Sequence, residues 1–248
     1  MIHILTYFKN DSGYQYRYKG TDTADRYLRL QIDALNHIGE VPIIATNFDF
    51  EYGSVKALKM DKFADWSAFA NKVPALNAII KHYGIADDIC YKDVDCYTLI
   101  KHEFPTKKDM GFVLHSLPGR SKLQGGCQYW SRNSYDIIEV LAERMITKRI
   151  KKEEKYFNRF FRVMNWTDRL DILNYRYNFF RQSEMERKYV LTQLPIINMH
   201  FKWEYETCTN RFVEGKNRHN VKVCPEWLRD LAIKHQLYKE SNEISKTI

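Results

Sequence analysis

The chain has 248 residues, of which 44% are apolar and 28% charged, which is the composition of a folded domain and not of a disordered chain. Its formal charge of +8 favours an anionic partner or substrate but leaves the fold open. Five cysteines without a Cys-x-x-Cys pair argue against a zinc ribbon or a disulfide framework, and no segment resembles a signal peptide or a membrane span. We therefore expect a cytoplasmic protein with reduced thiols.

The N-terminal segment alternates strand and helix patterns. Residues 2–8 form an apolar run that predicts a strand, and residues 24–38 have the spacing of an amphipathic helix that Gly39 ends. A second apolar run follows at residues 41–46. A strand, a helix and a strand with short connections predict a right-handed crossover and hence a parallel sheet.

The following hundred or so residues continue in the same way. A short helix or turn, a helix ending at Gly84 and two strands are expected, in this order, at residues 63–69, 74–83, 89–92 and 112–116. Gly125 and Gly126 then indicate a flexible link.

The C-terminal half changes character and favours helices. The expected elements are a helix at residues 134–146 that continues into the basic run 148–155, a helix at 168–180, a strand at 194–199 and a helix at 226–238. We therefore predict one α/β domain over residues 1–248 with a helical elaboration between residues 134 and 180.

Two acidic residues, Asp93 and Asp95, follow the expected strand at residues 89–92. Because one residue separates them, an extended backbone would direct both side chains to the same side. The carboxyl end of a parallel strand borders the crevice where α/β sheets bind ligands. Two carboxylates there suit Mn²⁺ or Mg²⁺, which keep positions for substrate phosphates and act as Lewis acids. A capped turn is the structural alternative for this triplet.

The helix segment Lys72–Asn77 and the strand segment Asp88–Asp95 together resemble the core of the GT-A glycosyltransferases. In that family a Lys- or Arg-bearing helix precedes the strand that carries the Asp-x-Asp motif. The resemblance implies a Rossmann-type, mostly parallel sheet flanked by helices, with the helical elaboration in the C-terminal half. Lys92 departs from the family pattern, which has apolar residues immediately before the first Asp.

The resemblance also implies a division of labour and a set of binding residues. Residues 1–133 would bind a nucleotide sugar, above all a UDP-sugar, and residues 134–248 would bind the acceptor. Asp93 and Asp95 would hold the metal ion, and His200 would be its third ligand, as in several GT-A groups. The donor would contact Thr6, Tyr7, Phe8, Lys72, Asp93, Gly125, Gly126 and Lys202. A solvated Lys72, an ordinary strand-end His200 and packed aromatics at the end of the first strand are the structural alternatives.

A carboxylate in a later helix faces the acceptor in GT-A enzymes, and Asp168 and Asp171 are similar to it in position. Such a carboxylate would deprotonate the acceptor hydroxyl if the transfer inverts the sugar, or position the acceptor if the transfer retains it. The two residues and the two outcomes remain open, and an Asp that interacts with a helix dipole is the structural alternative.

Cations and aromatics alternate in the run 148–162, which suggests a DNA-binding helix. Its basic residues are Lys148, Arg149, Lys151, Lys152, Lys155, Arg159 and Arg162. The aromatics between them would pack beneath the cations or wedge into an opened duplex. In profile the chain resembles the phage-encoded sugar transferases that modify hydroxymethylated bases in DNA, which would place it in the host cytoplasm and require base flipping. An amphipathic surface helix with solvated lysines is the structural alternative.

Three other functions remain open. A GT-A enzyme with a glycan or lipid acceptor would share the donor chemistry and place the basic run against an anionic surface. A nuclease or other metal-dependent nucleic-acid-binding protein would use Asp93 and Asp95 for phosphodiester cleavage, with Glu103 and Asp109 as the nearby acidic residues. The last alternative is a binding module without catalysis.

Overall fold

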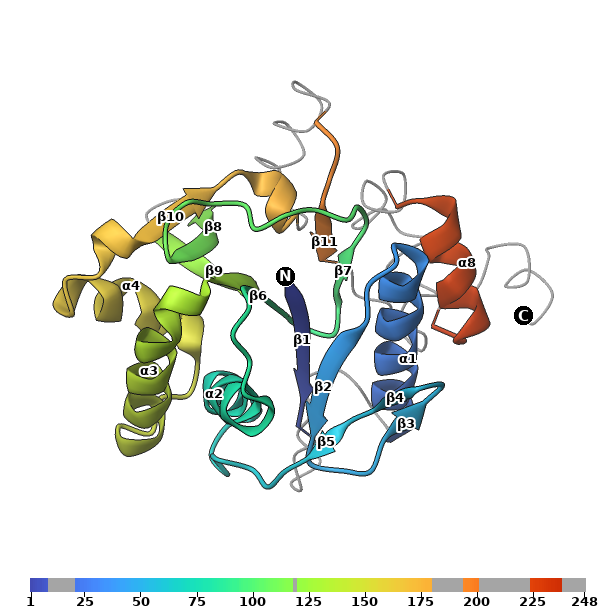
Figure 1. The fold of residues 1–248 in the computed structure, drawn as a ribbon, viewed down its shortest axis with the longest axis horizontal. Helices are drawn as coiled ribbons and strands as arrows, with labels where there is room; N and C mark the ends of the chain where they lie inside the picture. The colour runs from blue at the N-terminus through green and yellow to red at the C-terminus, as the bar shows by residue number, and fades with distance from the viewer. Residues whose placement is uncertain (9–20, 118–119, 180–193, 201–223, 238–248) are drawn as a thin grey trace.

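The computed structural model describes residues 1–8, 21–117, 120–179, 194–200 and 224–237. Its centre is a seven-stranded sheet in the order β10-β8-β9-β6-β1-β2-β5, flanked by helices (Figure 1). These strands are β1 (Ile2–Tyr7), β2 (Pro42–Thr46), β5 (Leu58–Lys59), β6 (Ile89–Lys92), β8 (Met110–Leu117), β9 (Arg120–Trp130) and β10 (Leu170–Leu173).

The helices described are α1 (Thr21–His37), α2 (Lys72–Tyr83), α3 (Tyr135–Thr147), α4 (Glu153–Val163) and α8 (Glu226–Lys234). Short 3-10 turns occur at η1 (Ala68–Asn71), η2 (Arg132–Ser134), η3 (Thr167–Arg169) and η4 (Tyr175–Tyr177). Two small sheets pair β3 (Glu51–Tyr52) with β4 (Val55–Lys56) and β7 (Cys96–Thr98) with β11 (Asn198–His200). Among the residues described, no helix has the length and apolar character needed to span a membrane.

The parallel half of the sheet confirms the predicted crossover. β1 pairs in parallel with both β2 and β6, and β2 pairs in parallel with β5. Helix α1 connects β1 to β2 and α2 precedes β6, so the carboxyl ends of β1, β2 and β6 lie at the same edge of the sheet. Gly84 ends α2 in the left-handed conformation (φ 59°), which glycine adopts without a side-chain clash.

The other half of the sheet contains the one antiparallel strand. β9 runs antiparallel to both β6 and β8, and β10 pairs in parallel with β8. The sheet is therefore mixed but mostly parallel, as the predicted fold class requires. Because β9 is antiparallel to both neighbours, β8 and β10 run in the same direction as β6, so their carboxyl ends lie at the same edge of the sheet as that of β6.

The two faces of the sheet bury two separate hydrophobic cores. Leu5 and Cys90 point toward the first core, with α1 and α8, whereas Ile4 and Tyr91 point toward the second, with α2, α3 and α4. Figure 1 shows α1 and α8 on one side of the sheet and α2, α3 and α4 on the other. Successive residues of β1 and β6 thus face opposite layers, which explains why apolar residues occur at adjacent positions in both strands.

Three expected elements differ from the structure. Gly125 and Gly126 are not in a flexible link but in the interior of β9. The basic run is not one continuous helix, because α3 ends at Thr147 and α4 begins only at Glu153. Residues 168–180 are not a helix: they begin with the one-turn η3 and continue into β10, whose edge position leaves Ile172 50% exposed. An exposed apolar residue in a short edge strand gives a pattern that looks helical in sequence.

Candidate functional site

The acidic triplet lies at the carboxyl edge of the parallel strands, directly after β6. It forms a turn and not an extended strand end, because the Cys96 N–H donates to the Asp93 carbonyl oxygen at 3.0 Å. The Asp93 N–H in turn donates to the Gly126 carbonyl oxygen at 2.9 Å, so β9 supports the turn from the side. Since the backbone turns here, Asp93 and Asp95 do not share the environment that strict strand alternation would give them.

A glutamine from α1 holds this turn in place. The Gln31 side chain is fully buried, and its Nε2 donates to the carbonyl oxygens of Val94 and Cys96, each at 2.9 Å. A longer contact of 3.4 Å reaches the carbonyl oxygen of Asp93. One amide therefore gathers the backbone of the entire acidic turn, and this fixes the turn without using either carboxylate.

Asp93 is part of a compact ion cluster with residues from two helices. The Nζ of Lys72, the first residue of α2, lies 2.6 Å from Asp93 Oδ1 and 3.0 Å from Glu153 Oε1. Asp93 keeps 21% of its side-chain surface exposed, whereas Glu153 at the start of α4 keeps 2%. The exposed end of the cluster is therefore the carboxylate of the acidic turn, and the buried end is Glu153.

The electrostatics of this cluster keep Lys72 charged. Burial alone would lower the pKa of Lys72, but the carboxylates of Asp93 and Glu153 raise it well above its ordinary value. Burial raises the pKa of Glu153, and the negative charge of Asp93 raises it further, although Lys72 opposes both effects. Lys72 is thus a permanent positive charge at the carboxyl edge of the sheet.

A close approach of α4 to β9 makes the cluster possible. The Gly125 N–H donates to Glu154 Oε1 at 3.2 Å, and a Cβ at Gly125 would lie 2.8 Å from Glu153 Oε1. No side chain larger than hydrogen fits there without displacing the side chains of Glu153 and Glu154. Gly125 therefore acts by allowing this contact, and the position predicted as a donor-binding turn is a buried strand position beside Glu153.

Asp95 lies in a different environment, on the side of α1. Its residue surface is 7% exposed, and its carboxylate lies near the hydroxyl group of Tyr7 at the end of β1. Burial, together with the negative charges of Asp25 and Asp95, raises the pKa of Tyr7 to about 12. Tyr7 therefore keeps its proton at neutral pH, and the negative charge that collects around it suits a cation.

The small sheet of β7 and β11 brings the backbone of His200 to the acidic turn. His200 pairs with Cys96, the residue after Asp95, in the antiparallel register. A buried polar chain holds this register, since Lys92 Nζ donates to Thr98 Oγ1 at 2.6 Å and Thr98 Oγ1 donates to Asn198 Oδ1 at 2.7 Å. Lys92, which departs from the GT-A pattern, is thus buried and belongs to this hydrogen-bonded network. The His200 side chain lies outside the described structure.

The remaining donor-site candidates have mixed placements. Thr6 is buried, with its Oγ1 2.6 Å from the Tyr91 hydroxyl, and Phe8 is packed with 8% of its surface exposed. Tyr7 packs edge-on against Phe48, with ring centroids 6.2 Å apart. Of the three residues that end β1, only Tyr7 is both partly exposed and close to the acidic turn. Lys202 lies outside the described residues.

The structure does not bring Asp168 and Asp171 to this edge. Asp168 is exposed in η3, just ahead of β10, and β10 begins at the opposite edge of the sheet because it runs parallel to β8. The neighbouring Arg169 confirms this position, since it binds Asp109 at 2.6 Å at the start of β8. Asp171 accepts a hydrogen bond from Thr106 Oγ1 at 2.8 Å. Neither carboxylate can face an acceptor at the acidic turn.

The basic run does reach the carboxyl edge, although its aromatics do not face solvent. Phe157, Phe160 and Phe161 of α4 are buried in the second core. Their predicted role as wedges in a duplex is therefore wrong, and the packing alternative holds. The link 148–152 lies against the loop that precedes Lys72: Ser67 Oγ donates to the Lys151 carbonyl oxygen at 2.7 Å.

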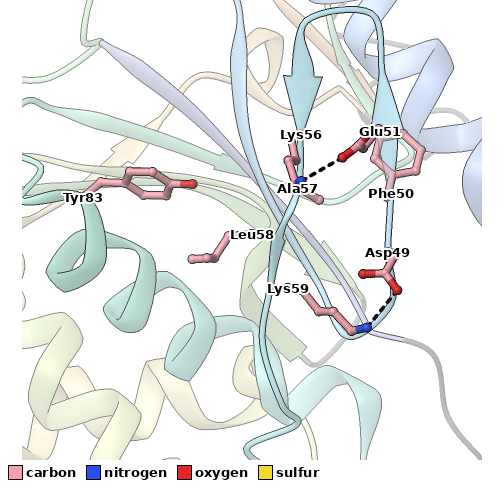
Figure 2. A pocket seen from close by; sticks show the side chains of 8 residues that line it. All are labelled: Asp49, Phe50, Glu51, Lys56, Ala57, Leu58, Lys59 and Tyr83. Carbon is pink, nitrogen blue, oxygen red and sulfur yellow. Dashed lines mark hydrogen bonds and ion pairs between the residues drawn. The ribbon is translucent and has the colours of Figure 1, made fainter.

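A cavity of about 610 Å³ lies away from these residues, at the open edge of the sheet. Figure 2 shows its lining, in which Tyr83 of α2 faces Leu58 of β5. Two exposed ion pairs border it, Lys56 with Glu51 at 2.9 Å and Lys59 with Asp49 at 2.8 Å. None of the candidate site residues lines this cavity, so it is separate from the acidic turn.

Sequence reasoning missed two residues that shape the site, Gln31 and Glu153. Gln31 lies on the buried face of an amphipathic helix, where a polar residue is rare, and this was an available signal. Glu153 follows a run of lysines and opens a helix, so it looked like a solvated N-terminal acid. Nothing in its sequence neighbourhood distinguishes it from the adjacent Glu154.

The residues present fit a divalent cation in part. The acidic turn carries the carboxylates of Asp93 and Asp95, and Asp25 adds a further negative charge near Tyr7. Among the side chains described, no group of three or more His, Cys, Asp and Glu residues converges as a complete metal site. A third protein ligand would have to come from outside that set, and the backbone pairing of His200 with Cys96 places one candidate beside Asp95.

Comparison with known proteins identifies the fold. Neither a family model nor a curated protein sequence matches this chain. A glycosyltransferase involved in glycosylation of the major capsid of PBCV-1 matches over 80% of this chain and 92% of its own, with a TM-score of 0.52 and 9% identity. An active-site mutant of LgtC matches over 93% of this chain and 100% of its own, with a TM-score of 0.51 and 11% identity. The chain therefore has the GT-A glycosyltransferase fold.

Proposed function

We propose that this protein is a metal-dependent glycosyltransferase that moves a sugar from a nucleotide-sugar donor to a hydroxyl acceptor. The observation that carries the proposal is the acidic turn at the carboxyl edge of the sheet, with the buried Lys72 against Asp93. Carboxylates that can hold a divalent cation, together with a fixed positive charge at this edge, would stabilise a diphosphate leaving group. The GT-A fold supports the same chemistry by analogy.

Each residue of the acidic turn has a role in this proposal. Asp95 and Asp93 would hold Mn²⁺ or Mg²⁺, with His200 as a further ligand in its neutral form. The bound metal ion would supply Lewis-acid neutralisation of the leaving diphosphate. Lys72 stays protonated and adds a point charge to the same phosphates. Tyr7, whose proton is retained at neutral pH, can donate a hydrogen bond to the donor.

The proposal keeps the division of the chain into a donor half and an acceptor half. Residues 1–133 supply β1, α1, α2 and the acidic turn, and would bind the donor, with UDP-sugars as the first candidates. Residues 134–248 would bind the acceptor, for which a hydroxymethylated base in phage DNA is our candidate. The basic run at the carboxyl edge supports an anionic acceptor, and Asp168 and Asp171 have no part in the reaction proposed here.

The proposal is tested by thermal shift and by hydrolysis of UDP-glucose in the absence of acceptor, each with and without Mn²⁺. We expect Mn²⁺ with UDP to stabilise the wild type, and the Asp95→Asn variant to lose this stabilisation and at least 100-fold of the hydrolysis rate. Asp87→Asn, an exposed carboxylate near the start of β6, is the matched control and should behave as wild type. Equal Mn²⁺-dependent stabilisation of the wild type and the Asp95→Asn variant would exclude the metal site.

A further inference from the structure

The loop between α3 and α4 presents cations at the same edge of the sheet as the acidic turn. Arg149 and Lys151 are exposed in this loop, and Lys152 directly precedes the buried Glu153. Lys152 Nζ lies 5.1 Å from the centroid of the Phe69 ring, and Lys72 Nζ lies 5.4 Å from the same ring. A single aromatic ring therefore connects this loop to the ion cluster of the site.

The loop is held firmly by its neighbours. Trp66 Nε1 donates to the Ile150 carbonyl oxygen at 3.3 Å, and Ser67 Oγ donates to the Lys151 carbonyl oxygen at 2.7 Å. Asn71 fixes the segment that supplies Trp66 and Ser67, since its Oδ1 accepts from Phe63 N and its Nδ2 donates to the Ser67 carbonyl oxygen. The cations are thus carried on a braced backbone, which reduces the entropy lost when an anion binds.

Arg149 occupies a conformation that favours glycine. Its φ is 48°, and its N–H donates to the Ile146 carbonyl oxygen at 3.1 Å just after the end of α3. Helices usually place glycine at such a position, because other residues are strained there. The guanidinium of Arg149 stacks over the Trp66 ring, 4.8 Å from its centroid. This strained position thus carries a large cationic side chain that stacks on Trp66 and stays exposed.

Helix α4 extends the positive surface away from the site. Arg159 and Arg162 are exposed and lie three residues apart, so they share a face of α4. Within the described part of the chain, no carboxylate forms an ion pair with any of these four cations: Arg149, Lys151, Arg159 and Arg162. Arg162 lies nine residues beyond the start of α4, so the cations from the loop to Arg162 extend along about 13 Å of the helix axis, which is longer than one phosphate group requires.

We infer that Arg149, Lys151 and the exposed face of α4 form a binding strip for the phosphodiester backbone of duplex nucleic acid. The aromatics of α4 lie beneath the surface, so the strip contacts phosphates and not bases. Trp66 lies under the guanidinium of Arg149, so this edge presents charge and no apolar side chain for insertion into a membrane, which favours a phosphodiester backbone as the partner. The substrate class rests on the proposed function, because the strip leads to the acidic turn where the accepting hydroxyl would be glycosylated.

The binding strip is tested by fluorescence anisotropy with a 20-base-pair DNA duplex between 50 and 200 mM salt. The affinity of the wild type should fall by at least 100-fold over this range, as expected for four or five phosphate contacts. The Arg149→Gly/Lys151→Ala variant should bind at least tenfold more weakly at 50 mM salt, with the slope of log affinity against log salt reduced by about two.

The matched control is the Lys56→Ala/Lys59→Ala variant, which removes the same charge from the exposed ion pairs at the β5 edge. It should keep the wild-type slope. The assignment would be overturned if both variants lost affinity equally, or if the wild type did not bind the duplex at 50 mM salt. It would also be overturned if pyrophosphate competed as strongly as the duplex at an equal concentration of phosphate groups. Arg149→Gly/Lys151→Ala should keep both the wild-type melting temperature and the stabilisation by UDP with Mn²⁺, so failure of the strip is distinguishable from failure of the donor site.

Discussion

At the scale of single residues, the site depends on how closely α4 approaches β9. Gly125 permits the approach, and Lys72 joins the two carboxylates that the approach brings together. A buried cluster of one cation and two carboxylates is stable only while its geometry is kept, because loss of one partner leaves an uncompensated buried charge. The ion cluster is therefore sensitive both to volume and to charge.

Replacing Gly125 by Ala tests the volume requirement. The added Cβ would lie 2.8 Å from Glu153 Oε1 and 2.9 Å from Glu154 Cγ, so both glutamate side chains would have to move and the contact of Glu153 with Lys72 would be disturbed. We expect a loss of about 1–3 kcal/mol in the free energy of unfolding in urea, together with weaker binding of UDP with Mn²⁺. Gly111→Ala is a useful comparison, because its Cβ would lie 2.8 Å from Leu173 Cδ1, far from the site. Gly111→Ala should lose stability and keep nucleotide binding. If Gly111→Ala lost nucleotide binding and Gly125→Ala kept it, the role of Gly125 would be contradicted.

Glu153 gives the cluster a pH dependence of known sign. Its pKa is raised in the folded protein, mainly by burial, so the folded state holds the proton more tightly than the unfolded state. The contribution of Glu153 to stability is therefore greatest below its unfolded pKa of about 4.3 and is lost as the pH rises through the folded pKa. We expect the stability of Glu153→Gln relative to wild type to rise with pH above about 4. Glu139→Gln, at an exposed ion pair with Lys81, should show no such trend in the same urea titrations.

At the scale of elements, the acidic turn is an irregular segment that α1 makes rigid. Gln31→Leu removes the amide that donates to the carbonyl oxygens of Val94 and Cys96 and leaves them buried without this donor. The cost should be about 1–3 kcal/mol of unfolding free energy, with a loss of Mn²⁺-dependent UDP binding. Leu30→Ala, on the same helix and also fully buried, should cost a similar amount or more and keep that binding. Unchanged binding in Gln31→Leu would remove the turn from the metal site.

Elements with a strong local pattern could be predicted from the sequence, and those defined by their partners could not. Residues 2–7, 72–83 and 89–92 follow their apolar periodicity closely. The sequence around Gly125 predicts a link and not a strand, because the helix that requires this glycine is distant in sequence. The sequence of β10 predicts a helix, because an edge strand with an exposed Ile172 carries no clear alternation.

The same distinction applies to the site. The place of Asp93 and Asp95 at the carboxyl edge could be predicted, because they directly follow a recognisable strand. Asp168 was predicted on position along the chain alone, and the direction of β10 places it at the wrong edge. The direction of a strand depends on the whole sheet topology, and no local pattern encodes it.

At the scale of the whole molecule, the acidic turn lies where the two helical layers meet at one edge of the sheet. Asp93 contacts the layer of α2 and α4, whereas Asp95 lies near Tyr7 and the layer of α1. The layer of α1 is completed by α8, whose Leu228 and Ala232 are fully buried in the first core. Docking of α8 against α1 therefore influences the side of the site that holds Asp95.

The contact between α8 and α1 is pH-sensitive. Asp33 of α1 accepts hydrogen bonds from Lys234 at 2.7 Å and from His235 at 2.9 Å. Burial alone would raise the pKa of Asp33, but the hydrogen bonds from Lys234, His235 and Tyr52 lower it below its ordinary value. Burial lowers the pKa of His235. Each lowered pKa gives stability that is present above the unfolded value and lost as the pH falls. His235 is affected first, below about pH 6.5, and Asp33 below about pH 4.

Acidification should therefore release α8 before the rest of the molecule unfolds. We expect amide hydrogen exchange over residues 226–234 to accelerate between pH 7 and pH 5, after correction for the intrinsic pH dependence, while β1 and β6 stay protected. Asp33→Asn should loosen α8 already at pH 7, by about 1 kcal/mol once solvent screening of this partly exposed group is considered. His235→Phe keeps an aromatic ring beside Tyr52, where the centroids lie 5.9 Å apart, and should abolish the acceleration. Asp49→Asn, at the fully exposed pair with Lys59, should leave the exchange profile unchanged. If α8 stays as protected at pH 5 as at pH 7 in the wild type, the Asp33 and His235 contact does not control its docking.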